Sequence, residues 1–238
     1  MMDHLFTAGL VALSASFIQS VVGFGAGLIS MALLSMIWPV HFATLVMAPL
    51  GLLMTSTLTW RLRAQVKLRA LIPLLAGLPF GVALGILGYE RLPVGYLRGG
   101  LGALLICSAL YHGLSHRWGR AAPRGLGPAL GVLSGVTGVS LNSPGPPAII
   151  YATLMGWSPR HFRANLSLFF LLSGCCAVLT LSLRGHLRLE SLKVSASLAP
   201  ALLLGVWLGS AVAEHIPTDL FRRLTLLLLV GLGLLLLR

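Results

Sequence analysis

The chain has 238 residues, of which 57% are hydrophobic and only 9% are charged. Soluble domains carry about 25% charged residues, so this composition excludes a globular protein folded in water and indicates an all-α protein that crosses a lipid bilayer several times. The net charge of +12 does not indicate nucleic-acid binding, because the Lys and Arg residues lie in or beside short gaps between long apolar runs, as in the cytoplasmic loops of membrane proteins.

Eight apolar runs follow one another along the chain. They lie at residues 5–38, 42–60, 70–89, 95–113, 126–157, 162–183, 191–213 and 217–237. Most are close to the ~20 residues that an α-helix needs to cross the ~30 Å hydrocarbon core of a bilayer. The runs that begin at Leu5 and Leu126 are too long for one crossing, and each is interrupted in its middle by helix-breaking residues.

The second half of the chain repeats the first. Near the start of each half, positions 120 apart carry the same residue, as in the pairs Ser14 and Ser134, Gly25 and Gly145, Pro39 and Pro159, and His41 and His161. Farther along, the spacing widens to 124, as in Glu90 and Glu214, and Pro93 and Pro217. Small insertions in loops produce such a drift. The pattern predicts two homologous transmembrane repeats, residues 5–113 and 126–238, joined by a cytoplasmic linker at 114–125.

Each repeat opens with a segment that is broken at the corresponding place and is followed by three further spans. The first break covers residues 22–27 and contains three glycines, and the second covers residues 141–147 and contains three prolines. Proline removes a backbone donor, and clustered Gly and Pro residues end a helix. Unpaired backbone groups at membrane depth are tolerated only where protein or a wet cavity surrounds them. We therefore expect both breaks inside the bundle.

Paired breaks of this kind indicate the substrate site of a transporter. Half-helices that start after Gly27 and after Pro147 would direct free N–H groups and positive dipole ends to membrane depth, which favours an anion. The candidate substrate-binding residues of the two breaks are Gln19, Ser20, Gly23, Gly25, Gly27, Ser140, Asn142, Ser143 and Gly145. Arg163 and Asn165 are added because they open the following span and are placed to line a path into the site. The alternative for Arg163 is that its guanidinium group extends to the membrane surface.

Other glycines are assigned to helix packing. Small residues spaced four apart let two helices approach closely, and the residues with this spacing are Gly77, Gly81, Gly85, Gly205 and Gly209.

The distribution of acidic residues bears on the substrate. All five lie outside the middle of the apolar runs, which argues against a cation as substrate and weakens a proton relay through carboxylates. The sequence also has no metal-binding motif or catalytic constellation, so it assigns no metal, cofactor or catalytic residue.

The residues around the two breaks resemble the motifs of a known family. Residues 22–28, followed by Pro39 and Ala43, resemble the first motif of the sulfite exporter TauE/SafE family of anion permeases, and residues 143–147, followed by Pro159 and residues 163–165, resemble its second motif. The resemblance covers nearly the whole chain. It implies a multi-pass protein of the bacterial inner membrane that moves small sulfur-containing anions such as sulfite or sulfonates. Ala26 departs from the commoner triple-glycine form, so the identity of the substrate is not carried over.

These observations predict a secondary carrier or facilitator for a small, sulfur-containing anion, with the anion and the lipid bilayer as its partners. Two other classes stay open. One is an intramembrane enzyme, although Ser140, Ser143 and His161 lack an acid that would orient the histidine. The other is a scaffold subunit without transport activity. The sequence does not show the transport direction or the oligomeric state. It also does not show whether transport is coupled to a proton or to another ion.

The orientation of the second repeat depends on how the opening segments cross the membrane. If each is a hairpin that returns to the same side, each half crosses three more times and the halves are inverted. If each crosses once, the halves are parallel. The distribution of Lys and Arg fits both arrangements, whereas the length of the opening segments favours hairpins and inversion.

Overall fold

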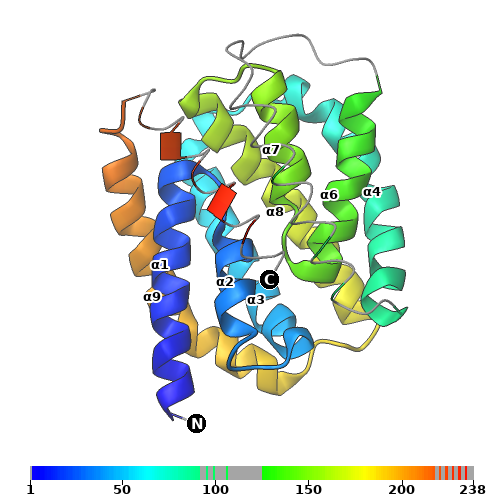
Figure 1. The fold of residues 1–238 in the computed structure, drawn as a ribbon, viewed down its shortest axis with the longest axis vertical. Helices are drawn as coiled ribbons and strands as arrows, with labels where there is room; N and C mark the ends of the chain where they lie inside the picture. Colours follow the sequence, from blue (N-terminus) through cyan, green and yellow to red (C-terminus); the bar gives the residue numbers. More distant parts are fainter. Residues whose placement is uncertain are drawn as a thin grey trace.

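The computed structural model describes residues 2–91 and 125–217, together with a few scattered residues between 95 and 106 and between 220 and 234. Within this part the chain forms eight α-helices and one short 3-10 helix, with no strand (Figure 1). Five of the helices are long and apolar enough to cross a membrane. The chain is therefore a polytopic helical membrane protein. The spans predicted at 95–113 and 217–237 and the linker at 114–125 lie almost entirely outside the described residues.

The first half contains both a broken opening segment and two long helices. Its elements are α1 (Met2–Val22), α2 (Ala26–Leu34), α3 (Val40–Leu62), the 3-10 helix η1 (Arg63–Gln65) and α4 (Leu68–Arg91). The chain turns between α1 and α2 because Gly23 and Gly25 adopt left-handed φ angles of 93° and 107°, which residues with a Cβ rarely tolerate.

The second half has the same order of elements. They are α6 (Leu126–Leu141), α7 (Gly145–Leu154), α8 (Pro159–Leu183) and α9 (Leu189–Ala213). Here Asn142 ends α6 in the left-handed conformation with a φ of 50°, and the N–H of Ser143 donates to the carbonyl of Thr137, which closes the helix end.

The predicted starts of the two short helices need correction. The second helix of the first break begins at Ala26 rather than after Gly27, and that of the second break begins at Gly145 rather than after Pro147. Proline is accepted in the first turn of a helix because the N–H it lacks has no partner there. The tandem prolines therefore lie inside the first turn of α7 instead of ahead of it.

The two broken segments enter the bundle from opposite ends (Figure 1). We call end A the end at which α3 and α9 begin and α4 and α8 end; there His186 lies 3.3 Å from Glu90. End B is the end at which α4 and α8 begin; there the N–H of Lys67 donates to the Oδ1 atom of Asn165. The hairpin of α1 and α2 opens at end A, and the hairpin of α6 and α7 opens at end B.

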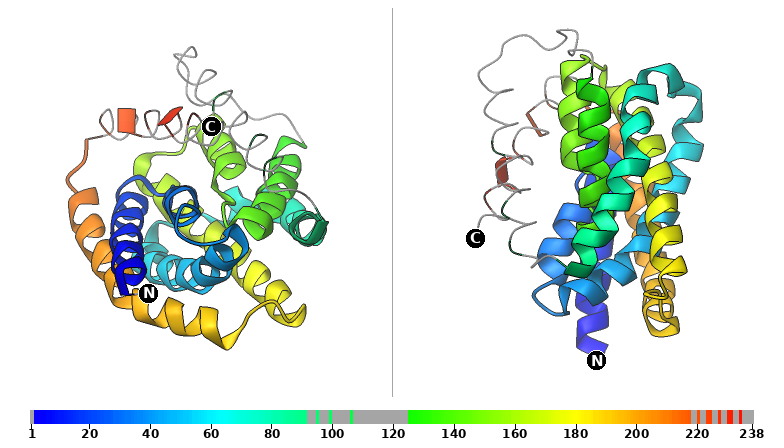
Figure 2. Two further views of the ribbon diagram at one scale, coloured as in Figure 1. Left: turned by 60° about the horizontal axis from the view of Figure 1, so that its bottom comes forward. Right: turned by 90° about the vertical axis from the view of Figure 1, so that its right-hand side faces the viewer.

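Helices from the two halves of the chain pack crosswise. The two most extensive contacts join α4 to α6 and α1 to α9, and α3 lies against both α8 and α9 (Figure 2). The hydrophobic core is divided accordingly. One cluster combines α4 with α6, α7 and α8, and the other combines α1, α2 and α3 with α9. The last described helix of each half, α4 or α9, thus packs mainly against helices of the other half.

Glycines make these crosswise contacts possible. A Cβ on Gly77, Gly81 or Gly85 of α4 would overlap the backbone of α6, and a Cβ on Gly205 or Gly209 of α9 would overlap the backbone of α1. Hydroxyl groups add hydrogen bonds at the same contacts: Ser140 donates to the carbonyl of Gly85, and Ser16 donates to that of Leu202. The packing role predicted for these five glycines is confirmed.

The outer surfaces of the long helices are apolar. Large hydrophobic side chains that are exposed on α4 and α9 include Phe80, Leu84, Leu87, Leu204 and Trp207. In water such surfaces would be unfavourable, whereas lipid chains are as apolar as they are. The buried positions between the helices instead hold many Ser and Thr side chains, whose hydroxyls mostly donate to backbone carbonyls one turn earlier.

The α4–α6 contact can be tested with one methyl group. We expect Gly81→Ala to lower the thermal midpoint of the purified protein by about 3–10 °C, because the new Cβ meets the carbonyl of Val132 and overpacking costs about 1–3 kcal/mol. Gly9→Ala is the matched control, since Gly9 of α1 faces α9 but its Cβ would lie 4.0 Å from the nearest atoms. Equal midpoints for both variants would contradict the assigned packing.

Candidate functional site

A small cavity lies where the two breaks meet. It has a volume of about 60 Å³ and is closed on its sides by the middle parts of α3 and α8. Because α3 and α8 each cross the bundle from one end to the other and their middle parts line the cavity, it lies near the middle of the bundle. The two short helices α2 and α7 both begin at its wall, at Ala26 and Gly145.

Six of the eleven candidate residues line this cavity. They come from both breaks and are Gln19, Gly25, Gly27, Asn142, Ser143 and Gly145. The fold therefore brings together residues that are more than a hundred positions apart in the chain.

Three candidates next to the breaks point elsewhere. The Ser20 hydroxyl donates to the carbonyl of Ser16, and Ser140 donates to Gly85 in α4, so both serve helix contacts. Gly23 lies against Arg163, because a Cβ at this glycine would come within 3.0 Å of the Cγ atom of that arginine.

The two candidates on α8 lie at end B. Arg163 lines a separate hollow beside the end of α9. Asn165 is 0% exposed, and its Oδ1 atom accepts a hydrogen bond of 2.8 Å from the N–H of Lys67, so it holds the loop before α4. Neither residue is part of the cavity wall.

Several residues of the cavity wall were not among the candidates. They lie in the middle of α3 and α8, and those with polar or very small side chains are Gly51, Thr55, Ser173 and Gly174. Their small size within long apolar runs is a signal that the sequence contains. It does not tell which of the many small residues face inward, because that depends on the helices packed around them.

The cavity offers hydrogen-bond donors without any charge. None of the described residues in its wall is acidic or basic. The hydroxyls of Ser143 and Ser173 and the side-chain amide of Asn142 have no hydrogen-bond partner among the described residues, and neither do the N–H groups of Gly27 and Leu28 in the first turn of α2. Such groups can bind an anion through hydrogen bonds and the helix dipole.

Gln19 organises the first break. Its Oε1 atom accepts a hydrogen bond of 3.0 Å from the N–H of Ala26, and its carbonyl accepts one from the N–H of Gly23. One side chain thus caps the start of α2, and its Nε2 group remains as a further donor at the cavity. The two short helices differ in this respect, because Pro146 and Pro147 leave the first turn of α7 with few N–H groups.

The two breaks also touch each other directly. A Cβ on Gly27 would overlap the backbone carbonyl oxygen of Asn142, so α2 can lie against the end of α6 only because this position is a glycine. The contact joins the first half of the chain to the second at the wall of the cavity.

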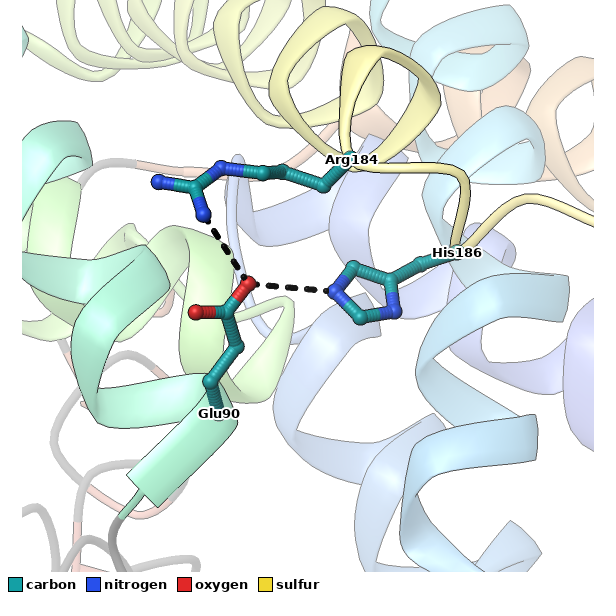
Figure 3. Close-up of polar contacts among 3 residues, drawn as sticks. All are labelled: Glu90, Arg184 and His186. Carbon is teal, nitrogen blue, oxygen red and sulfur yellow. Dashed lines mark hydrogen bonds and ion pairs between the residues drawn. The ribbon is translucent and has the colours of Figure 1, made fainter.

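A wider hollow of about 650 Å³ lies at end A. Glu90 at the end of α4 lies between two basic groups, with its Oε1 atom 3.6 Å from Arg184 and 3.3 Å from His186 (Figure 3). The ring of Tyr89 packs edge-on against His41 and His186. These contacts connect α3, α4 and the loop between α8 and α9 at one end of the bundle.

The described residues do not form the serine–histidine pair considered from the sequence. His161 contacts Ser158 in its own turn, with Nδ1 2.8 Å from the hydroxyl, and does not pair with Ser140 or Ser143. No group of three or more His, Cys, Asp and Glu side chains within the described part is placed to hold a metal ion.

Comparison with known proteins identifies one family. The model of the family described as "Sulfite exporter TauE/SafE" matches residues 8–236, which is nearly the whole chain. Among curated proteins and among solved structures, no match to the chain was found.

The contact between the breaks generates a prediction. We expect Gly27→Ala to lower the thermal midpoint by about 3–10 °C, because its Cβ would overlap the carbonyl of Asn142. Gly145→Ala is the matched control, since a Cβ there would lie at least 3.6 Å from other atoms. If both variants melt like the unmodified protein, the breaks do not touch as described.

Proposed function

The chain belongs to the sulfite exporter TauE/SafE family, and from this premise we propose that it carries a small oxyanion, sulfite first among the candidates, across the bacterial inner membrane. Members of the family are membrane transporters and not enzymes. The observation that carries the proposal is the cavity at mid-depth to which both breaks contribute donors.

The chemistry of the cavity wall supports an anion. A carboxylate in the wall would repel it, and the described wall has none. The described wall has no basic residue either, so no fixed positive charge holds the anion there. Hydrogen bonds from N–H, hydroxyl and amide groups stabilise negative charge without a fixed counter-ion, so the anion can bind and leave.

The size of the cavity supports a compact anion. The cavity is small, with a volume of about 60 Å³, and it is large enough to hold more than a single water molecule. Sulfite, with one sulfur and three oxygens, fits this space. An organosulfonate with a carbon chain requires the wall to widen, for instance beside Phe170 or Leu52.

We infer further that the two halves are inverted repeats. The hairpins that open at opposite ends support this, as do the crosswise contacts of α1 with α9 and of α4 with α6, which occupy corresponding positions in the two halves. Alternating access would then be a rocking of one group of helices against the other around the cavity. The contact of Gly27 with Asn142 lies at the boundary between those groups.

Gln19→Glu tests the proposed site by charge alone. In proteoliposomes that contain the full chain, we expect the unmodified protein to move sulfite and the variant to move it at least about tenfold more slowly, because the carboxylate repels the anion. The variant should still fold, because the carboxylate keeps the oxygen that accepts the hydrogen bond from the N–H of Ala26 and lies near the positive end of the α2 dipole.

If the variant moves sulfite as fast as the unmodified protein, the cavity is not the site through which sulfite passes. If the unmodified protein moves neither sulfite nor a sulfonate, the proposed function itself is contradicted.

The inverted arrangement can be tested with two engineered cysteines. In a variant without Cys107, Cys175 and Cys176, we expect Gln65→Cys and Arg188→Cys to react with a membrane-impermeant thiol reagent from opposite sides of the membrane, because residue 65 lies at end B and residue 188 at end A. Labelling of both from the same side would mean that the halves are parallel.

A further inference from the structure

A second hollow, separate from the central cavity, lies at end B. It has a volume of about 350 Å³ and lies between the first turn of α8 and the end of α9. Ser158, Arg160 and Arg163 form one wall, and Glu214 and Pro217 form part of the other. None of these residues lines the central cavity.

Arg163 is buried in this hollow, and its guanidinium group has no hydrogen-bond partner among the described residues. The residue is only 8% exposed, and its Nε atom is buried with no hydrogen bond. Its guanidinium group makes neither a hydrogen bond nor an ion pair with any described residue; the hydroxyl of Ser167 donates to the backbone carbonyl of Arg163, not to its side chain. Glu214 lies across the same hollow and attracts the guanidinium without forming an ion pair with it, and Arg160 and Arg163 together outweigh this one carboxylate.

A buried guanidinium in this state is unfavourable unless something pairs with it. Removing a charge from water is costly, and leaving it unpaired adds to that cost. Arginine also presents its donors in a planar fork that matches two oxygens of an oxyanion. An oxyanion in the hollow would therefore satisfy groups that the described protein leaves unsatisfied.

The first turn of α8 adds to the attraction. Pro159 occupies the first position of the helix, and the N–H groups of Arg160 and His161 have no acceptor among the described residues. These groups and the dipole of a 25-residue helix favour negative charge at this end. Arg160 contributes a further positive charge beside the hollow.

The side chain of Arg163 also touches the first break. Its Cγ atom would lie 3.0 Å from a Cβ on Gly23, and Gly23 is two residues before Gly25, which lines the central cavity. An anion held by Arg163 is thus held beside the hairpin that contributes half of the central site.

We propose that Arg163, Arg160 and the first turn of α8 form a second oxyanion site at end B, which the transported anion occupies on its way to or from the central cavity. This inference rests on the proposed function for the identity of its ligand. It assigns a binding role to a residue that the central cavity does not use.

The test counts binding sites on the full chain purified in detergent and titrated with sulfite. The unmodified protein is expected to bind two equivalents. Arg163→Gln should remove the equivalent at end B, or weaken it at least about tenfold, because charge-assisted hydrogen bonds are lost. Gln19→Glu should remove only the central equivalent, and the double variant should bind none. Arg163→Lys, which keeps the charge but not the fork, should bind with intermediate affinity.

Arg69→Gln is the matched control, because Arg69 is an exposed arginine at the same end of the bundle; two equivalents should remain. If the unmodified protein binds only one equivalent of sulfite, and Arg163→Gln still binds it, the proposal is overturned while the central site stands. If Gln19→Glu changes neither binding nor transport but Arg163→Gln still removes an equivalent, the central assignment fails and the site at end B stands.

The same chemistry could bind the phosphate of a lipid headgroup, and mass spectrometry of co-purified lipid separates the two sources. A loss of bound anionic phospholipid in Arg163→Gln, with sulfite binding unchanged, would overturn the assignment to the transported anion. Unchanged lipid content together with the loss of one sulfite equivalent would support it.

Discussion

The structure depends on how backbone polar groups are paired where two helices stop inside an apolar bundle. Lipid offers no hydrogen bonds, so each interruption must find partners within the protein or in a wet cavity. The first break meets part of this demand through Gln19, whose side chain and carbonyl bond Ala26 and Gly23. The second meets it through the bond from Ser143 to Thr137. The N–H groups of Gly27 and Leu28, which have no partner among the described residues, lie at the central cavity, so the constraint that shapes the fold also supplies donors of the proposed site.

Close contact between helix backbones holds these breaks in place. In a membrane, apolar side chains gain little by leaving lipid, so association relies on van der Waals contact and hydrogen bonds. The glycines of α4 and α9 allow their partners α6 and α1 to approach until only a hydrogen atom fits between the backbones. Because each of these pairs joins the two halves of the chain, the hairpins cannot pack without the other half. The site that lies between them is shared for the same reason.

The distribution of charge suggests how an anion is drawn in without being trapped. The described wall of the central cavity is neutral, whereas the hollows at both ends contain basic groups, with Arg160 and Arg163 at end B and Arg91 and Arg188 at end A. Acidic residues are present as well, Glu214 at end B and Glu90 and Glu190 at end A, and Glu214 and Glu90 occupy corresponding positions of the proposed repeats. Strong electrostatic attraction is thus confined to the ends, where water is near, and weaker hydrogen bonding acts at mid-depth, where a fixed charge would be costly.

The sequence by itself determined the membrane class, the positions of the two breaks, the packing role of the spaced glycines and the family, because composition, run length and paired Gly and Pro residues are local properties. It also named six residues of the cavity, since these belong to the breaks themselves. Only the tertiary structure decided that Ser20 and Ser140 serve helix contacts, that Gly51 and Ser173 complete the wall, and that Arg163 belongs to a separate hollow at end B. The reason is physical: spacing along one helix tells which residues share a face, but what that face meets is set by the helices that cross it.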